Sequence, residues 1–170
     1  MERLWSPWRS MYIDSMKDKK DDMSCVFCNA VEEETDNTDS LVVFRRNNIF
    51  SVLNLYPYNN GHLMVVPNRH ISDLSEITIE EFVEITSQIT LATEALKKLY
   101  SPHGFNIGAN IGKAAGAGID THIHFHIVPR WNGDTNFMPV IGEAKIISHE
   151  LIETKKNLIK SIEELLKQNS

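Results

Sequence analysis

The stretch THIHFHIVPR, residues 121–130, decides how this chain of 170 residues is interpreted. Three apolar side chains alternate in it with three histidines, which are His122, His124 and His126. Successive side chains of a β-strand point to opposite faces, so residues 121–129 predict a strand with one face in a core and all three imidazoles on the other. Three of the seven histidines of the chain lie within five residues, which packing alone hardly explains.

Four more strands are expected before this one. Residues 41–44 and 49–54 are largely apolar and are separated by Arg-Arg-Asn-Asn, which predicts a hairpin. An Asn-Gly turn then leads into the apolar run 62–66, and residues 105–110 have the same strand-like character. We therefore expect a five-stranded antiparallel sheet.

Two helices are expected to accompany the sheet. Thr78 and Glu81 have the spacing of a capping box, and apolar residues then recur at helical spacing, which predicts a helix over 78–100. A second amphipathic pattern covers residues 148–167. The expected fold class is α+β, with one long helix packed on the sheet and a helix at the C-terminus.

Length and composition are those of one ordinary globular domain. The chain is 42% hydrophobic and 24% charged, and its length is sufficient to bury a sizeable core. No apolar run approaches the ~18 residues that a transmembrane helix needs. Residues 1–10 carry tryptophans, a proline and charges where a signal peptide would be apolar. We therefore expect a cytoplasmic protein without membrane contact.

Charge and cysteine content narrow the class of protein further. The chain has 17 basic and 23 acidic residues and a net charge of −6, which argues against a surface that holds nucleic acid. Its only two cysteines, Cys25 and Cys28, are too few and too close together to cross-link a secreted fold. Metal ligation or redox chemistry is their expected use.

The histidine-rich strand has three interpretations. Its histidines could face solvent without a function, although unpartnered polar groups are costly on a half-buried sheet. They could ligate a metal, for which neutral imidazole is well suited. An imidazole nitrogen could instead attack phosphorus and split one hard displacement into two easier ones. The last two are compatible if different histidines do each job.

Two motifs in separate parts of the chain together carry a resemblance to one known family. One is HIHFHIVP with the Gly/Ala-rich loop 112–118 before it, and the other runs from Asn54 to GHLMVVP at 61–67. Over residues 25–136 the chain resembles the histidine triad (HIT) family of nucleotide hydrolases and transferases. The opening LWSPWR and the stretch after the triad, with PRW and NFMP, further resemble the bacterial branch that contains diadenosine tetraphosphate phosphorylases.

The resemblance assigns chemistry to two of the histidines. It implies that His124 is the nucleophile, which attacks the α-phosphorus of an adenosine nucleotide and forms a nucleotidyl-histidine intermediate. It implies that His126 contacts the transferring phosphate or the leaving-group oxygen. The implied activity is that of a nucleotidyl transferase or hydrolase on dinucleoside polyphosphates, foremost phosphorolysis of diadenosine tetraphosphate to ATP and ADP. The alternatives are hydrolysis of the same substrates or of adenosine phosphoramidates, and a non-catalytic nucleotide-binding module.

The resemblance also implies substrate contacts. Asn54 corresponds to the ribose-binding residue of the family, although it equally suits a turn at a strand end. Asn110 and Trp131 correspond to positions near the phosphates or the nucleotide, and this tryptophan could also serve packing or a dimer contact. Gly116 and Gly118 would let backbone N–H groups approach phosphate oxygens.

The chain departs from the family pattern at one position. Many members carry Gln or Ser four residues before the first histidine, where this chain has Gly118. Only main-chain contacts to phosphate can act from there. The choice between water and phosphate as the acceptor therefore stays open.

Cys25 and Cys28 need two more ligands to complete a tetrahedral zinc site. In the zinc-bearing members of the family the positions of His70 and His122 join the two cysteines, so the resemblance implies a structural zinc on these four residues. The alternative is a dithiol without metal or a redox pair, which would want the first cysteine at the start of a helix after a strand. Whether a divalent cation accompanies the substrate stays open.

The expected organisation is a single domain over residues 1–170. An aromatic-rich arm over 1–24 precedes a HIT core over 25–136, and a C-terminal helix covers 144–168. The resemblance further implies a homodimer in which two sheets continue into each other, with a small nucleotide as the substrate.

Overall fold

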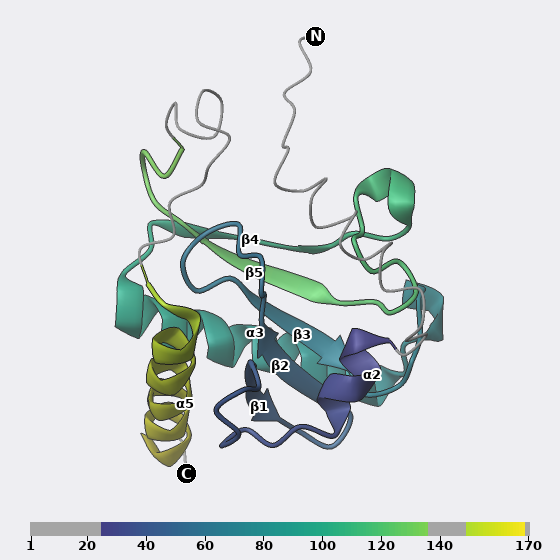
Figure 1. Cartoon of the computed structure of the whole chain (residues 1–170), viewed down its shortest axis with the longest axis horizontal. Coiled ribbons are helices and arrows are strands. Elements are labelled where there is room, and N and C mark those ends of the chain that lie inside the picture. Colours follow the sequence, from purple (N-terminus) through teal and green to yellow (C-terminus); the bar gives the residue numbers. More distant parts are fainter. Residues whose placement is uncertain (1–24, 136–148, 169–170) are drawn as a thin grey trace, which may run out of the picture.

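The chain forms one antiparallel sheet. The computed structural model describes residues 25–135 and 149–168. Within them five strands pair in the order β1-β2-β3-β5-β4, and every pair is antiparallel. These are β1 (Val42–Arg45), β2 (Ile49–Leu53), β3 (Leu63–Pro67), β4 (Gly104–Ala109) and β5 (Phe125–Arg130). The predicted α+β fold is confirmed, with β1 and β4 at the sheet edges (Figure 1).

The long helix α3 (Ile79–Tyr100) begins at the predicted capping box. The hydroxyl of Thr78 accepts a hydrogen bond from the backbone N–H of Glu81, and the Glu81 carboxylate accepts one from the backbone N–H of Thr78. These two bonds satisfy N–H groups that have no partner inside the helix. The helix ends at Ser101, whose φ of 46° turns the chain away.

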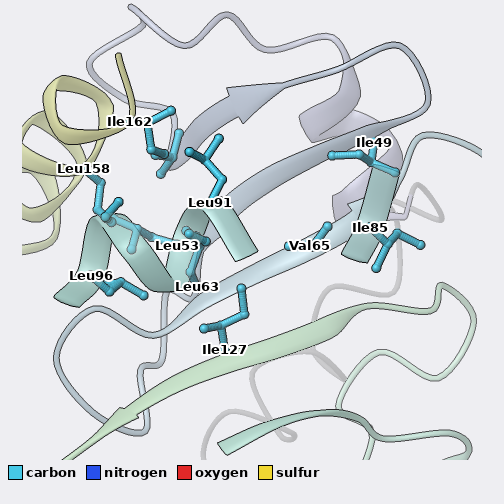
Figure 2. Close-up of a cluster of buried hydrophobic side chains, with 13 residues drawn as sticks. Ile49, Leu53, Leu63, Val65, Ile85, Leu91, Leu96, Ile127, Leu158 and Ile162 are labelled. Carbon is cyan, nitrogen blue, oxygen red and sulfur yellow. The ribbon is translucent and has the colours of Figure 1, made fainter. Parts of the chain in front are cut away.

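One face of the sheet is covered by α3 and by α5 (Leu151–Gln168), and the main core lies between them. Figure 2 shows side chains from both helices meeting side chains of the strands. The labelled members are Ile49, Leu53, Leu63, Val65, Ile85, Leu91, Leu96, Ile127, Leu158 and Ile162. Lys155 adds a polar tie, because its Nζ donates to the carbonyl oxygens of Asn37 at 2.7 Å and Ser40 at 2.8 Å.

The opposite face carries a second, smaller core under a short helix that the sequence analysis missed. This helix, α2 (Val26–Val31), packs through Phe27 and Ala30 on strand residues of this face such as Val52 and Met64. Its last carbonyl groups are capped from β1, since the guanidinium of Arg45 donates to the carbonyl oxygen of Ala30 at 2.5 Å. The sheet is thus layered between helices on both faces (Figure 1).

The last strand starts later than predicted. Residues 121–129 were expected to be strand, whereas β5 begins at Phe125. Before it, the backbone N–H of Ile123 donates to the carbonyl oxygen of Ile71 at 2.7 Å, and the ring of His124 bonds to the carbonyl oxygen of His122. Such a local side-chain bond competes with the strand ladder. Of the three histidines, His126 alone belongs to the strand itself.

Two parts of the prediction lie outside the described residues, namely the aromatic arm over 1–24 and residues 144–148 of the expected C-terminal helix. The helix α5 itself begins at Leu151, three residues after the start of the amphipathic pattern at 148 and seven after the start of the expected C-terminal segment at 144. None of the helices that the structure describes has the length and apolar character to cross a membrane.

Candidate active site and metal centre

A cavity of about 710 Å³ opens on the α2 side of the sheet. Part of its lining is apolar and comes from Phe27, Leu41 and Val52, and part is polar and includes His124 and His126. Its volume lies within the range of about 300–1,000 Å³ that is usual for small-molecule sites. The cavity can therefore hold a ligand that has both an apolar and a phosphate-bearing part.

The ring of His124 is held by the backbone two residues before it. Its Nδ1 lies 2.9 Å from the carbonyl oxygen of His122. A carbonyl oxygen only accepts hydrogen bonds, so Nδ1 of His124 carries the hydrogen and Nε2 keeps its lone pair. His124 lines the cavity in the form that a nitrogen nucleophile requires.

The ring of His126 carries its hydrogen on the other nitrogen, Nε2, because of its hydrogen bond with His62. The backbone N–H of Tyr58 donates to Nδ1 of His62 at 3.0 Å, so the hydrogen of the neutral His62 ring is on Nε2. This Nε2 lies 2.9 Å from Nδ1 of His126 and donates to it. His126 therefore accepts at Nδ1 and carries its own hydrogen on Nε2, from which the neutral ring can donate a hydrogen bond to a phosphate or leaving-group oxygen.

Burial keeps the rings of His62, His122 and His124 neutral. His62, His122, His124 and His126 are all less than 9% exposed, which overturns the solvent-facing interpretation. Burial lowers the pKa of His124 below its ordinary value, and it lowers the pKa of His122 in the same direction. Burial first, and then the neighbouring rings of His126 and His124, lower the pKa of His62 to about 3. The lone pair on Nε2 of His124 is thus available at neutral pH.

A second cluster lies beside the triad. The ligand atoms of Cys25, Cys28, His70 and His122 all lie within 4.8 Å of one another. Sγ of Cys28 is 3.2 Å from Nδ1 of His70 and 3.7 Å from Nδ1 of His122, and Sγ of Cys25 is 3.4 Å from the latter. Tetrahedral zinc, with Zn–S about 2.3 Å and Zn–N about 2.0 Å, separates such a sulfur and nitrogen by about 3.5 Å. The four side chains fit a zinc ion.

The outer contacts of the cluster favour a metal over redox chemistry. Nε2 of His122 lies 2.9 Å from the carbonyl oxygen of Pro67 and donates to it, which leaves the Nδ1 lone pair for a metal. Cys25 does precede a helix, as a redox pair would. However, a redox pair needs no further ligands, whereas His122 and His70 place a ring nitrogen against the sulfurs of Cys25 and Cys28.

Comparison with known proteins decides the family. Residues 35–133, more than half of the chain, match the family model described as the HIT domain. The chain belongs to the HIT domain family. His122, His124 and His126 all lie within the matched residues, and His124 and His126 line the cavity described above.

Two curated relatives of this HIT domain are enzymes by name. The chain is 40% identical over 162 residues to the AP-4-A phosphorylase of Mycobacterium tuberculosis, which covers 93% of this chain and 83% of the relative. It is 29% identical over 119 residues to the asymmetrical bis(5'-nucleosyl)-tetraphosphatase of Schizosaccharomyces pombe, which covers 70% of this chain and 62% of the relative.

A solved structure agrees with the fold of this HIT domain. It is a Zn-bound histidine triad family protein from Mycobacterium smegmatis, with a TM-score of 0.69 and 27% identity, over 86% of this chain and 98% of that one. The zinc is a property of that protein. For this HIT domain, the structure supplies a cluster of four residues that could hold a metal ion.

The structure brings together some of the expected substrate contacts. Asn54, Asn110 and Gly118 line the large cavity with the two catalytic candidates. Asn54 also forms the turn that its alternative interpretation predicts, because its Oδ1 accepts from the backbone N–H of Tyr56 at 2.9 Å. Asn110 lines a neighbouring cavity of about 350 Å³ as well. The roles of these residues toward a nucleotide stay predictions.

The other two expected contacts do not line either cavity. The backbone N–H of Gly116 donates to the carbonyl oxygen of Lys113 at 2.9 Å and closes a short 3-10 turn. The indole N–H of Trp131 donates to the carbonyl oxygen of Tyr100 at 3.3 Å, which places the ring at the end of α3. This position matches the packing interpretation of Trp131, and a nucleotide contact for either residue stays a prediction.

Sequence reasoning missed two aromatic residues of the site. The ring centroid of Phe27 lies 4.9 Å from that of His124 and 5.5 Å from that of His122. Tyr58 stacks on His126 with centroids 5.7 Å apart and an angle of 28° between the rings. A signal existed for Phe27, which lies between the two cysteines. Tyr58 looked like an ordinary turn residue.

Proposed function

We propose that this HIT domain protein is a nucleotidyl transferase that splits diadenosine tetraphosphate with inorganic phosphate, through a nucleotidyl group on His124. The observation that carries the proposal is the pair of opposite ring forms in one cavity, a lone pair on Nε2 of His124 beside a hydrogen on Nε2 of His126. The ring centroids of these two residues are 4.8 Å apart. The 40% identity to a protein named AP-4-A phosphorylase supports the substrate.

In the first step, Nε2 of His124 attacks the α-phosphorus of one adenosine. A P–N bond forms and the P–O bond to the remaining triphosphate breaks, so ATP leaves. The Nε2–H of His126 would donate a hydrogen bond to the departing oxygen and stabilise its negative charge, without giving up the proton. The carbonyl oxygen of His122 accepts from Nδ1 of His124 and stabilises the positive charge that the ring gains.

In the second step, inorganic phosphate takes the place of the departed ATP. One of its oxygens attacks the adenylyl phosphorus, the P–N bond breaks and ADP forms. His124 returns to its neutral form with the lone pair on Nε2, so the cycle balances. Attack by water instead gives AMP, which is the hydrolase alternative.

The nucleotide would bind in the large cavity in one orientation. The base packs among Phe27, Leu41 and Val52, where the lining is apolar. Asn54 bonds the ribose hydroxyl groups, and Asn110 and the backbone at Gly118 face the phosphates.

Zinc is the ion that suits the Cys25, Cys28, His70 and His122 cluster, because two thiolates and two imidazoles are a zinc ligand set. When bound, it would cross-link the segment before α2, the segment after β3 and the start of the triad. Its role here is structural, since all four positions of a tetrahedral ion are filled by protein.

A homodimer and a cytoplasmic location are part of the proposal. Among the described residues β4 pairs with β5 alone, so the outer edge of β4 can add a strand from a second copy. Light scattering of the purified protein would measure the oligomeric state, and cell fractionation would measure the location.

The product assay tests the function directly. The protein is incubated with diadenosine tetraphosphate, with and without ³²P-labelled inorganic phosphate, and the products are separated. Phosphorolysis gives ATP and ADP, with the label in the β-phosphate of ADP. ATP and AMP with no label incorporated would show the hydrolase, and the absence of turnover with retained nucleotide binding would show the binding module.

A further inference from the structure

One buried side chain ties the turn between β2 and β3 to the end of β5. Asn59 is 7% exposed, and its Nδ2 donates to the carbonyl oxygen of Pro129 at 3.0 Å and to Oδ2 of Asp134 at 2.8 Å. The backbone oxygen of Asn59 accepts from the N–H of His62 at 3.2 Å. The side chain uses both of its N–H groups, so Asn59 is fixed from both sides of the turn.

Asp134 is itself held by its neighbours. Oδ2 accepts from Nε of Arg130 at 2.6 Å and from the backbone N–H of Trp131 at 3.1 Å, and Oδ1 accepts from Nη2 of Arg130 at 2.8 Å. The Arg130 guanidinium holds the pKa of Asp134 well below its usual range, so the carboxylate is charged. A charged acceptor makes a stronger bond to Asn59 than a neutral one would.

Tyr58, the residue next to Asn59, bonds to the ring of His62, which in turn bonds to the ring of His126. The backbone N–H of Tyr58 donates to Nδ1 of His62, and the Tyr58 ring lies 4.5 Å from that of His62 between centroids. If the turn moved, this N–H would leave Nδ1 of His62. The longer contact from Nδ2 of Asn54, at 3.4 Å, would then be the remaining one at Nδ1 of His62. With that weaker partner the His62 ring could carry its hydrogen on either nitrogen, and so could the ring of His126.

The geometry points to Asp134 as a positioning residue for the transfer reaction, which acts through Asn59. It holds the turn in place, the turn sets the ring form of His62, and His62 keeps the hydrogen of His126 on Nε2. The effect on catalysis rests on the proposed function. The effect on the ring forms does not.

Asp134 lies outside both cavities, so we expect it to act on the reaction without contacting the substrate. Asp134 lines neither the large cavity nor its neighbour, and its charge is compensated by Arg130. A carboxylate near a polyphosphate would repel it, which also argues against direct contact. The route to the reaction therefore runs through the hydrogen bonds of the turn.

The experiment compares Asp134→Ala with Asp134→Asn in the full chain. Alanine removes the acceptor for Asn59, whereas asparagine keeps an oxygen that can accept from it. Long-range ¹H–¹⁵N NMR spectra of ¹⁵N-histidine protein report which ring nitrogen carries the hydrogen. We expect a single Nε2–H form of His126 in the wild type, a mixture in Asp134→Ala, and recovery of the single form in Asp134→Asn.

Kinetics supply the second measurement. We expect kcat of Asp134→Ala to fall by about tenfold or more, because a His126 ring that carries its hydrogen on the wrong nitrogen cannot donate to the departing oxygen, with KM changed by less than about threefold. Asn59→Leu breaks the same connection from the other side and should reproduce both effects if Asp134→Ala folds poorly. Lys98→Ala is the matched control, since it removes the exposed ion pair between Lys98 and Glu164, neither of which is bonded to Asn59 or Asp134.

Each outcome decides the proposal. Recovery in Asp134→Asn of both the ring form and kcat supports it. A single Nε2–H form of His126 in both Asp134→Ala and Asn59→Leu overturns it, and so does an unchanged kcat beside a mixed ring form. A Lys98→Ala protein with the same losses also overturns it, because general destabilisation would then be the cause. If the wild type shows no turnover, the proposed function fails and the NMR result alone decides whether Asp134 sets the ring form.

Discussion

The carbonyl oxygen of His122 lies 2.9 Å from Nδ1 of His124, while the ring of His122 faces two cysteines through its own Nδ1. One residue thus belongs to the metal cluster by its side chain and to the catalytic pair by its backbone. Whatever holds the His122 ring also holds the carbonyl group that sets the ring form of His124. The metal cluster and the nucleophile are therefore adjacent in the chain and coupled in space.

Cys28→Ser should weaken metal binding and reduce stability. Serine is a poor zinc ligand, and we expect zinc affinity to fall at least about 100-fold, since even changes outside the ligand set cost about 10–100-fold. Elemental analysis of protein purified without added zinc should find about one ion per chain in the wild type and much less in the variant. His103→Gln, which changes an exposed histidine outside the cluster, serves as the control. A metal-free wild type that is fully folded would contradict the zinc site.

His124→Ala should abolish turnover and leave nucleotide binding largely intact. Loss of the attacking nitrogen removes the covalent route, and we expect kcat to fall by about 10⁴-fold or more. Binding should persist because the apolar lining and Asn54 remain. The measurements are the product assay and calorimetric titration with a non-cleavable nucleotide analogue. A His124→Ala protein with the wild-type rate would rule out this residue as the nucleophile.

Stability should fall as the pH falls below about 6.5, because His62 is buried and neutral. Its pKa is about 3 in the folded chain against an ordinary value of 6.5, so between these values the unfolded chain binds a proton that the folded chain does not. The free energy of unfolding then decreases by up to about 1.4 kcal/mol per pH unit on acidification. His124 and His126 face His62, and burial of His124 acts in the same direction.

His62→Gln isolates this contribution. Urea unfolding of both proteins over a pH series gives the difference in their free energies of unfolding, in which effects of the metal ligands common to both largely cancel. We expect the wild type to lose stability more steeply than His62→Gln between about pH 6.5 and pH 3. Parallel curves would show that His62 is not the group responsible.

Gly61→Ala should destabilise the fold more than Gly133→Ala. Both glycines have positive φ, 73° and 78°, but a Cβ at Gly61 would lie 2.7 Å from Cδ2 of Leu96, whereas one at Gly133 meets nothing within 4 Å. We expect a loss of about 2–4 kcal/mol at Gly61, from backbone strain plus overpacking, and about 1 kcal/mol at Gly133 from strain alone. Equal losses in urea unfolding would mean that α3 yields to the added methyl group.

Much of the fold could be predicted because its signals are local. The apolar run of β3 and the capping box at Thr78 depend on side chains a few residues apart, and both were found within a residue of where they were expected. The helix α2 could not be predicted in this way. It is six residues long and has no side-chain cap at Cys25, and isolated helices below about 12 residues are marginal in water. Packing of Phe27 and the guanidinium of Arg45 stabilise it instead.

The residues of the site could also be predicted in part. His124, His126 and the four cluster residues could be chosen from residue type, spacing and resemblance to a family. The hydrogen positions on the rings could not, because they depend on the N–H of Tyr58, the carbonyl oxygen of Pro67 and the side chain of His62. The hydrogen bond between Asn59 and Asp134 could likewise not be predicted, since the two residues are 75 positions apart in the sequence.

The sequence by itself determined which chemical groups this protein has and the secondary structure that most of them occupy, since alternation, capping and turn residues act over short distances. Only the tertiary structure decided which nitrogen of each histidine is a donor and which is an acceptor. For His122 and His126 that choice follows from Pro67 and His62, partners 55 and 64 residues away that the sheet brings together. For His124 and His62 the partners lie only two and four residues away, but the folded backbone alone brings the donor and acceptor atoms into contact.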